Sequence, residues 1–281
     1  MRKAGTSLKT ALESVALAKS SYCHKPSGSR KPRALDPGLV EALEAVCQGY
    51  EAVYGYRKMA ETLEARGIHC NKKKVLRHMR VLKITQPRKI KGLKWTCPAV
   101  VKPTAPNTYW ETDFTYVWDG STNAYCCPVI DAWDKDIVGD SFSERCRAVE
   151  ACAALENAVL NRFGGKVPVG HILTLRVDRG SQFKARRFKE TAKALNVRLE
   201  YAGIQCPEDK PYIESFNGSY KKEEVYRREY RGLSDARAGW ETYRAWYKNE
   251  RLHQNLGYKS PRTFRETVGN QATRNPTLCM A

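Results

Sequence analysis

Three acidic residues stand at positions where strands and a helix can bring them together. Asp178 ends a short apolar run, residues 172–177, which is typical of a buried strand. Glu214 lies in the first turn of a helix that Pro211 opens, and Asp113 lies inside an earlier strand-like run. A carboxylate at the end of a strand and another at the start of a helix can converge on one side of a sheet. The spacing therefore predicts one site that holds three carboxylates.

Such a group of acids has a specific chemistry. Carboxylates without Cys or His among them are hard oxygen ligands, which suit Mg²⁺ or Mn²⁺ and suit zinc poorly. Two such ions about 3.5–4 Å apart can stabilise both the attacking and the leaving oxygen of an in-line phosphoryl transfer. The alternative is that each acid is a solvated surface group or a helix cap, which is the usual role of a lone Asp. We expect the three acids to hold metal ions for phosphoryl transfer.

A wider pattern of short motifs covers most of the chain, from about Tyr54 to Phe264. It consists of W-E-T-D-F-T-Y at 110–116, V-I-D at 129–131 with I-V-G at 137–139, D-R-G-S-Q-F at 178–183, Y-I-E-S-F-N-G at 212–218, and W-Y-K-N-E-R-L-H-Q-N-L-G-Y at 246–258 followed by Ser260-Pro261. In this order and spacing, the pattern resembles the downstream-frame (OrfB-type) product of the insertion sequence three family of transposases, which has a retroviral-integrase-like (DDE) catalytic core.

The resemblance implies an activity and a set of site residues. By this resemblance, the family's acidic triad corresponds to Asp113, Asp178 and Glu214, which would bind two Mg²⁺ or Mn²⁺ ions. It implies single-strand cleavage at an element end and transfer of that 3′-hydroxyl to DNA, which gives a circular intermediate before integration. The implied partners are the terminal inverted repeats, target DNA and further copies of the chain in a multimer. The chain departs from the family at two places: Asp209-Lys210-Pro211 stands where the family often has Asp-Asn-Ala, and Val177 replaces the usual small polar or His residue before Asp178. Neither departure removes a metal ligand.

The net charge of +19 is concentrated at the start of the chain. Residues 1–107 hold 22 Lys and Arg against 7 Asp and Glu, and the remaining residues hold 27 against 23. This asymmetry is typical of an N-terminal nucleic-acid-binding region joined to a domain in which basic and acidic residues are nearly equal in number. A basic solubilising tail is the alternative, but such tails lack the apolar periodicity that these residues have.

Three short helices are expected over residues 36–47, 56–66 and 71–82, with N-caps at Asp36 and Asn71. The last of them carries a basic face, which is typical of a helix-turn-helix DNA-binding domain. A plain three-helix spacer with a solvated charged face has the same pattern. The candidate DNA contacts are Arg57, Lys72, Lys73, Lys74, Arg77 and Arg80, and His78 is also expected to face outward.

The residues after this region predict a catalytic core. Strands are expected over 109–118, 124–132 and 137–142 as an antiparallel meander, followed by helix 147–163, the strand that ends at Asp178, helix 182–195 and strand 197–201. This order is that of the ribonuclease H-like fold. It places Asp113 on the first, central strand and Asp178 at the end of the fourth. The expected fold class is therefore α/β: a ribonuclease H-like core, with a mixed five-stranded sheet and flanking helices, preceded by a small all-α helix-turn-helix domain.

The expected domains follow from these changes in pattern. They are an N-terminal helix (to Tyr22) and basic linker over 1–33, the helix-turn-helix domain over 34–85, a Pro-rich basic linker over 86–106, the catalytic core over 107–228, and a C-terminal helical extension over 229–281. An aromatic stripe on an expected helix over 234–247 indicates core packing rather than base stacking, and His253 is expected to be structural.

Further DNA contacts are expected around the catalytic core. Gln182, Lys221 and Lys222 are candidates for positioning DNA near the metal ions. The linker over 86–106 could follow a DNA backbone or be a spacer, and the loop over 201–211 could contact DNA beside the site. The family's main end-recognition domain usually belongs to an upstream frame joined by frameshifting, so an upstream-frame partner or fusion is also implied.

Cysteine usage and hydropathy limit the cellular compartments in which this protein is expected. The ten Cys include no C-x-x-C pair, which argues against a zinc site or a disulfide framework and for free thiols in a reducing cytoplasm. No apolar run approaches the roughly 18 residues of a membrane span, and the first 20 residues contain no signal-peptide pattern. We expect a cytoplasmic, nucleoid-associated protein without a membrane partner.

The sequence therefore favours a metal-dependent polynucleotidyl transferase acting on the ends of its own element. Two other classes remain open. One is a DNA-binding repressor whose core is only a scaffold, and the other is a structure-specific ribonuclease H-like nuclease that cuts DNA without joining it.

Overall fold

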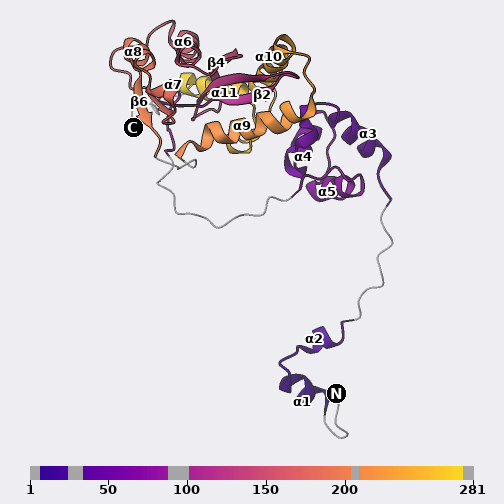
Figure 1. Cartoon of the computed structure of the whole chain (residues 1–281). Helices are drawn as coiled ribbons and strands as arrows, with labels where there is room; N and C mark the ends of the chain where they lie inside the picture. Colours follow the sequence, from indigo (N-terminus) through magenta and orange to yellow (C-terminus); the bar gives the residue numbers. More distant parts are fainter. Residues whose placement is uncertain (1–6, 25–33, 88–100, 204–208, 275–281) are drawn as a thin grey trace.

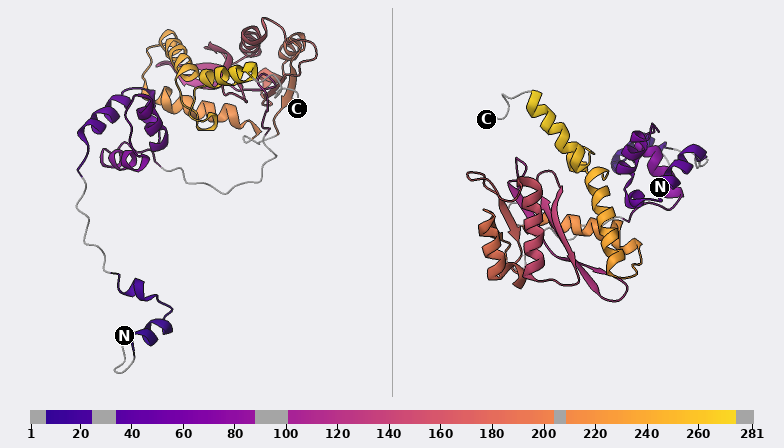
Figure 2. Two further views of the ribbon diagram at one scale, coloured as in Figure 1. Left: turned by 180° about the vertical axis from the view of Figure 1, so that it is seen from behind. Right: turned by 90° about the horizontal axis from the view of Figure 1, so that it is seen from above.

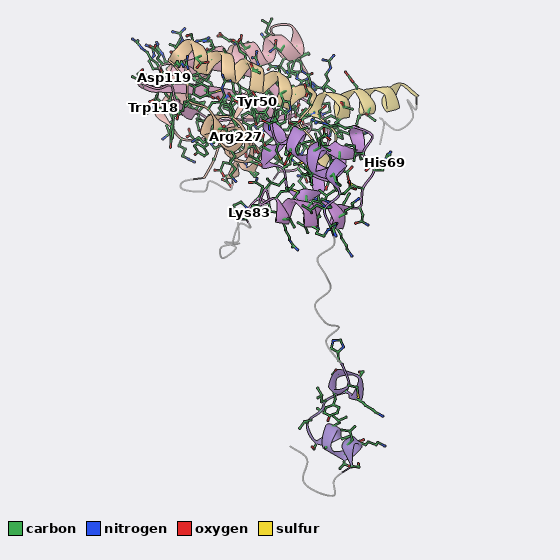
Figure 3. All side chains as sticks on the ribbon, turned by 90° about the vertical axis from the view of Figure 1, so that its right-hand side faces the viewer. Tyr50, His69, Lys83, Trp118, Asp119 and Arg227 are labelled. Carbon is green, nitrogen blue, oxygen red and sulfur yellow. The ribbon has the colours of Figure 1, made fainter. Side chains whose placement is uncertain are left out.

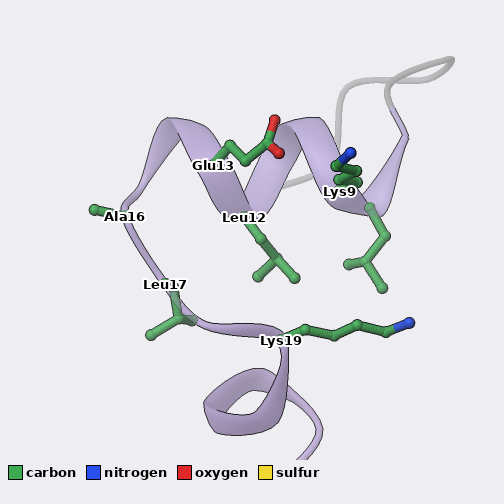
Figure 4. Close-up of a pocket in the computed structure, with 7 residues that line it drawn as sticks. Lys9, Leu12, Glu13, Ala16, Leu17 and Lys19 are labelled. Atoms are coloured by element: carbon green, nitrogen blue, oxygen red, sulfur yellow. The ribbon is translucent and has the colours of Figure 1, made fainter.

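The computed structural model describes residues 7–24, 34–87, 101–203 and 209–274 (Figure 1). The first of these segments forms two short helices, α1 (Leu8–Ser14) and α2 (Lys19–Tyr22), rather than the single helix that we expected up to Tyr22. The chain turns between them at Ala16, whose φ of 49° is left-handed and cannot continue a helix. Figure 4 shows the side chains of Leu12 and Leu17 that line the small hollow between the two helices.

The predicted helix-turn-helix region forms three helices and one 3₁₀ turn: α3 (Pro37–Val46), η1 (Tyr50–Val53), α4 (Tyr56–Ala65) and α5 (Lys72–Val81). Both predicted N-caps are confirmed. The Asp36 carboxylate accepts a hydrogen bond from the Leu39 N–H, and the Asn71 side chain accepts one from the Lys73 N–H. The apolar stripes of these helices meet at Leu43, Met59, Leu63, Val75 and Met79, which are all buried.

A mixed sheet forms the centre of the remaining chain. Its strands are β1 (Tyr109–Thr112), β2 (Thr115–Trp118), β3 (Asn123–Asp131), β4 (Ile137–Ser143), β5 (Thr174–Val177) and β6 (Arg198–Tyr201). β1 and β2 pair with β3 in one unbroken register, Thr112 opposite Val129 and Thr115 opposite Cys126, so they act as one strand that is interrupted at residues 113–114. The sheet thus has the predicted five strands, with β1 paired antiparallel to β3 and parallel to β5.

Helices cover both faces of this sheet. α6 (Ala148–Phe163), α7 (Ser181–Lys184) and α8 (Arg186–Ala194) lie on one face, and α9 (Pro211–Glu223) lies on the other (Figure 1). The adjacent Cys126 and Cys127 of β3 belong to the opposite cores, as expected for a strand. The single helix expected over 182–195 is wrong, because Ala185, with ψ 141°, separates α7 from α8.

The segment after α9 completes the second core. η3 (Val225–Arg227), α10 (Leu233–Asn249), η4 (Gln254–Leu256) and α11 (Pro261–Arg274) follow in order. The aromatic face of α10 is buried at Trp240, Tyr243, Trp246 and Tyr247, so its predicted role in core packing is confirmed. Within the described residues, no helix has both the length and the apolar character that a membrane span needs.

The helix-turn-helix region packs directly against the core, with α10 between it and the sheet (Figure 2). Tyr50 lies with its ring centroid 4.7 Å from that of Trp246, and Tyr54 accepts a hydrogen bond from the Leu252 N–H. Figure 3 shows Tyr50 and Arg227 at the junction of the two parts, where the Arg227 guanidinium donates to the Gly49 carbonyl at 2.8 Å. The helices and the core therefore share one hydrophobic cluster, which the division into separate sequence domains did not predict.

Candidate active site

Asp113 and Asp178 lie next to each other at one edge of the sheet. β1 and β5 are parallel neighbours in which Glu111 pairs with Arg176, so the same register sets Asp113 beside Asp178 directly after the two strands. Adjacent strands are about 4.8 Å apart. A local hydrogen bond orients each carboxylate, from the Phe114 N–H to Asp113 and from the Gly180 N–H to Asp178. The strands thus bring two of the three predicted acids together.

The environment of Asp113 favours a nearby cation. Burial raises the pKa of Asp113, the Lys210 ammonium lowers it, and the negative charge of Asp178 raises it. Lys210 Nζ lies 2.9 Å from Asp113 Oδ2, and this lysine is only 4% exposed. In the sequence, Lys210 stands out only as a departure from the family pattern. The structure shows that this departure contacts Asp113 directly.

Glu111 joins the strand that leads to Asp113 to the helix that carries Glu214. Its carboxylate, in the middle of β1, accepts hydrogen bonds at 2.9 Å from the backbone N–H groups of both Tyr212 and Ile213 in the first turn of α9. These N–H groups have no acceptor within their own helix. Burial raises the pKa of Glu111 to about 7, and the two backbone hydrogen bonds oppose that rise. The sequence motifs assign Glu111 no role. The feature that points to one is an acidic residue within a strand that is buried.

Glu214 follows these anchored residues in the first turn of α9. Its backbone N–H donates to the Lys210 carbonyl at 3.1 Å, and its side chain is exposed. Across the described part of the chain, no group of three or more His, Cys, Asp or Glu side chains is arranged to hold a metal ion. The fold therefore sets Asp113 and Asp178 side by side and puts Glu214 on the helix anchored to the same strand, without a closed three-ligand cluster.

Replacing Glu111 tests its role as an anchor of α9. Glu111→Ala leaves two N–H groups without their acceptor and is expected to lower the free energy of unfolding by about 1–3 kcal/mol. Glu111→Gln keeps an acceptor oxygen and is expected to lose less. Urea denaturation of both variants measures the difference, and equal losses would contradict the anchoring role.

The stability difference between wild type and Glu111→Gln is expected to depend on pH. Because the pKa of Glu111 is raised from 4.5 to about 7 on folding, the folded state holds this proton more tightly than the unfolded state. The contribution of Glu111 to stability therefore falls as the pH rises between these two values. Wild type should lose stability relative to Glu111→Gln over this window, and a constant difference between the two unfolding free energies would contradict the shift.

The candidate DNA contacts of the helix-turn-helix region differ in their surroundings. Arg57, Lys72, Lys73 and Arg80 are exposed. Four candidates have partners within the protein: Arg57 donates to the Tyr56 hydroxyl at 3.2 Å, Lys72 pairs with Glu61 and Lys74 pairs with Asp36, both at 2.6 Å, and Arg77 donates to the Ala34 carbonyl.

The expectation that His78 faces outward is wrong. His78 is fully buried, and its Nε2 accepts a hydrogen bond from the Asp36 N–H at 2.9 Å. The reason is its place one helical turn after Val75, which puts it on the apolar stripe of α5. Its ring joins α5 to the start of α3.

The candidates around the core occupy different settings. Lys222 is exposed, and Lys221 Nζ lies 4.0 Å from the ring centroid of Tyr116 on β2, a residue that is itself exposed. Gln182 folds back over Gly180, directly after Asp178 and Arg179. Much of the linker expected over 86–106 and of the loop expected over 201–211 lies outside the described residues, at 88–100 and 204–208.

Comparison with known proteins finds matches over most of the chain. Residues 103–207 and 195–261 each match a family model described as integrase core domain, and residues 35–91 match one described as HTH-like domain. The chain is 30% identical over 216 residues to an uncharacterized 31.7 kDa protein of insertion element IS407 from Burkholderia multivorans, which covers 75% of each chain. It is 26% identical over 253 residues to the transposase for insertion sequence element IS904 from Lactococcus lactis, covering 85% of this chain and 97% of that one.

Among solved structures, a chain of the simian T-cell lymphotropic virus intasome is similar at 15% identity, with a TM-score of 0.48, over 79% of this chain and 72% of that chain. The strand order described above is that of the ribonuclease H-like class predicted from the sequence. The IS407 relative, the two integrase core matches and the HTH-like match together identify the family. The chain belongs to the insertion sequence three family of transposases, as an OrfB-type protein with an integrase core domain.

Proposed function

We propose that this transposase cleaves and joins DNA at the ends of its element with Asp113, Asp178 and Glu214 as the metal-binding residues. The observation that supports this assignment is the register of the parallel strands β1 and β5, Glu111 opposite Arg176, which when continued beyond the strand ends brings Asp113 level with Asp178. Burial raises the pKa of Asp113, and the negative charge of Asp178 adds to that rise, so a bound cation would offset the repulsion between the two carboxylates.

The donor set fits a hard divalent cation. All three side chains offer carboxylate oxygens, which favour Mg²⁺ or Mn²⁺. When bound, two such ions supply activation of a water or a 3′-hydroxyl and stabilisation of the leaving 3′-oxygen. The chain's own residues position these acids: Glu111 holds the first turn of α9 against β1, and Lys210 balances the charge of Asp113.

Lys210 makes metal binding testable without catalysis. Its ammonium contacts the Asp113 carboxylate that would hold a cation, and its positive charge would repel that cation. Two unit charges about 4 Å apart interact with an energy of about 1–4 kcal/mol when the effective dielectric constant lies between about 80 and 20. Lys210→Ala is therefore expected to tighten Mg²⁺ binding about tenfold. Calorimetry at about pH 8, where the carboxyls are ionised, would measure it. Lys166→Ala, which removes an exposed lysine after α6, is the control. Unchanged or weaker binding in Lys210→Ala would contradict the competition.

The proposed substrates are the element's terminal repeats and target DNA. Arg57, Lys73 and Arg80 of the helix-turn-helix region, with Gln182, Lys221 and Lys222 beside the core, are the proposed contacts. We further propose that copies of the chain assemble to bridge two element ends, with or without an upstream-frame partner.

The experiment that tests the function is a cleavage and joining assay on labelled element-end DNA with Mg²⁺. Joined products from wild type that disappear in Asp178→Asn, with DNA binding intact, would establish the transferase. Cutting without joining would indicate the structure-specific nuclease. DNA binding without chemistry in either protein would indicate the repressor.

A further inference from the structure

A second polar site lies beside α9, on the side where the helix-turn-helix region meets the core. This basic pocket has a volume of about 440 Å³. Its lining comes from α4, β3, the β3–β4 turn, α9, α10 and the segment after α10, and its basic members are Lys58, Lys135, Arg251 and His253. Ser215 and Tyr212 from the start of α9 complete one wall, so the pocket adjoins the turn that carries Glu214.

Lys58 is the main unbalanced charge of the basic pocket. It belongs to α4, is half-buried, and has no carboxylate oxygen within 4.0 Å of Nζ among the described residues. Its Nζ lies 4.7 Å from the ring centroid of Tyr54. Burial and the Arg251 charge lower the pKa of Lys58 to about 7, opposed by Glu223. An ammonium kept out of water without an acid partner is costly unless an anion joins it.

Lys135 reaches the same pocket from the turn between β3 and β4. Its backbone has a left-handed φ of 63°, which a non-glycine residue adopts at some cost. The side chain lies with Nζ 3.6 Å from the ring centroid of Tyr212 and donates to the Ala132 carbonyl. Burial lowers the pKa of Lys135 to about 8, opposed mainly by Glu111. In the described part of the chain, this lysine likewise has no carboxylate within 4.0 Å.

The other two titratable members do not cancel this charge. The Arg251 guanidinium is paired with the buried Glu223 through two hydrogen bonds of 2.8 Å, so that pair is close to neutral as a unit. Burial, together with the charges of Arg251, Lys58 and Lys135, lowers the pKa of His253 to about 2, so its ring is neutral. The two lysines therefore leave the basic pocket with a net positive charge, half shielded from solvent.

We propose that the basic pocket binds a backbone phosphate of the DNA strand that enters the active site, held between Lys58 and Lys135. The proposal rests on the proposed function and extends it. A phosphodiester supplies the missing anion, and the exposed Ser215, Gln254 and Asn255 on the rim offer hydroxyl and amide donors to its oxygens. Because Lys58 comes from the helix-turn-helix region and Lys135 from the core, this phosphate links DNA binding to the site at α9.

The salt dependence of DNA binding by the full chain tests the proposal. Each phosphate contact that is lost reduces the slope of log affinity against log salt by about 0.9. Lys58→Ala and Lys135→Ala are each expected to reduce this slope by about 1 on labelled element-end duplex. Lys166→Ala, a lysine to alanine change in the exposed loop after α6, should leave the slope unchanged. Slopes for Lys58→Ala and Lys135→Ala that match that of Lys166→Ala would overturn the proposal.

Neutral backbone substitution then identifies the phosphate. Each phosphate near the element end is replaced in turn by a methylphosphonate, and affinity is measured for wild type and Lys58→Ala. At the bound phosphate, the replacement should weaken wild type and have little further effect on Lys58→Ala. If every replacement weakens both proteins equally, Lys58 does not contact the DNA backbone and the proposal fails.

Arginine at position 58 separates loss of charge from misfolding. Lys58→Arg keeps a charge that does not titrate, so it should keep the wild-type slope near neutral pH. Wild-type affinity should fall as the pH rises through about 7, where Lys58 loses its proton, and less so in Lys58→Arg. Tyr54, Arg251, Glu223 and His253 face Lys58, and Lys135, whose pKa burial lowers to about 8, lines the same pocket, so the comparison with Lys58→Arg isolates the part of the pH dependence that belongs to Lys58. Equal pH dependence in the two proteins would overturn the assignment to Lys58.

The outcomes also separate this proposal from the proposed function. Joined products from wild type with unaltered slopes in both lysine variants would remove only the basic pocket. Reduced slopes with no cleavage by wild type would leave the phosphate site and remove the transferase. Wild type that does not bind the duplex would overturn both.

Discussion

Asp178→Asn is expected to lower the rate of strand cleavage and joining by about 10³-fold, while DNA binding changes little. Asn has nearly the shape of Asp but lacks the negative charge that attracts a cation. A preorganised charge at the reacting centre commonly contributes about 10²–10³ in rate, and losing a ligand of a charged ion places this variant at the upper end. Its local structure should survive, because the amide oxygen can still accept the Gly180 N–H. Single-turnover cleavage of labelled element-end DNA with Mg²⁺ measures the rate.

Two companions and one control complete that experiment. Asp113→Asn and Glu214→Gln should show losses of the same order if the three acids act together. Glu156→Gln, a similar change on the exposed side of α6, should retain wild-type rates. Wild-type cleavage by Asp178→Asn would remove Asp178 from the proposed site, whereas loss in only one of the three variants would show that the acids do not form a unit.

Arg251→Ala is expected to have the largest effect on stability, a loss of about 3–5 kcal/mol in the free energy of unfolding. Arg251 is 7% exposed and Glu223 is 4% exposed, and their paired hydrogen bonds are in the interior. Removing the guanidinium leaves a buried carboxylate whose remaining side-chain partner is the Tyr243 hydroxyl, which donates to it at 2.8 Å. Urea denaturation of the single variant measures the loss.

The double variant shows whether the stranded charge is the cause. Glu223→Gln removes that charge, so Arg251→Ala combined with Glu223→Gln should be more stable than Arg251→Ala alone. Arg251→Lys should recover only part of the loss, because one ammonium cannot make the two parallel hydrogen bonds. A loss below about 1 kcal/mol in Arg251→Ala would mean that the pair contributes little more than an exposed ion pair.

The sequence alone was sufficient for the order of strands and helices and for the positions of the acids. Three strand-like runs joined by short turns along 109–142 predicted the antiparallel strands, and the apolar run before Asp178 predicted β5. The aromatic residues of α10 were correctly assigned to the core. These features depend on local periodicity, since the side that a residue faces follows from its spacing along a strand or helix. The burial of His78 was missed although its spacing from Val75 indicates it, because His78 stands among basic residues; its hydrogen-bond partner, the Asp36 N–H, lies 42 residues away and could not be predicted. The break at Ala185 had no signal in the apolar pattern.

Only the tertiary structure decided which charges meet. Glu111 caps a helix that begins 100 residues later, Lys210 contacts Asp113 across nearly as long a separation, and Lys58 and Lys135 face one pocket from two parts of the chain. Residue types and spacing cannot determine such contacts, because an ion pair or a helix cap depends on register and on the packing of whole elements. For this protein, the sequence determined the elements and the three candidate acids, and the fold determined the partners that orient them and adjust their charge.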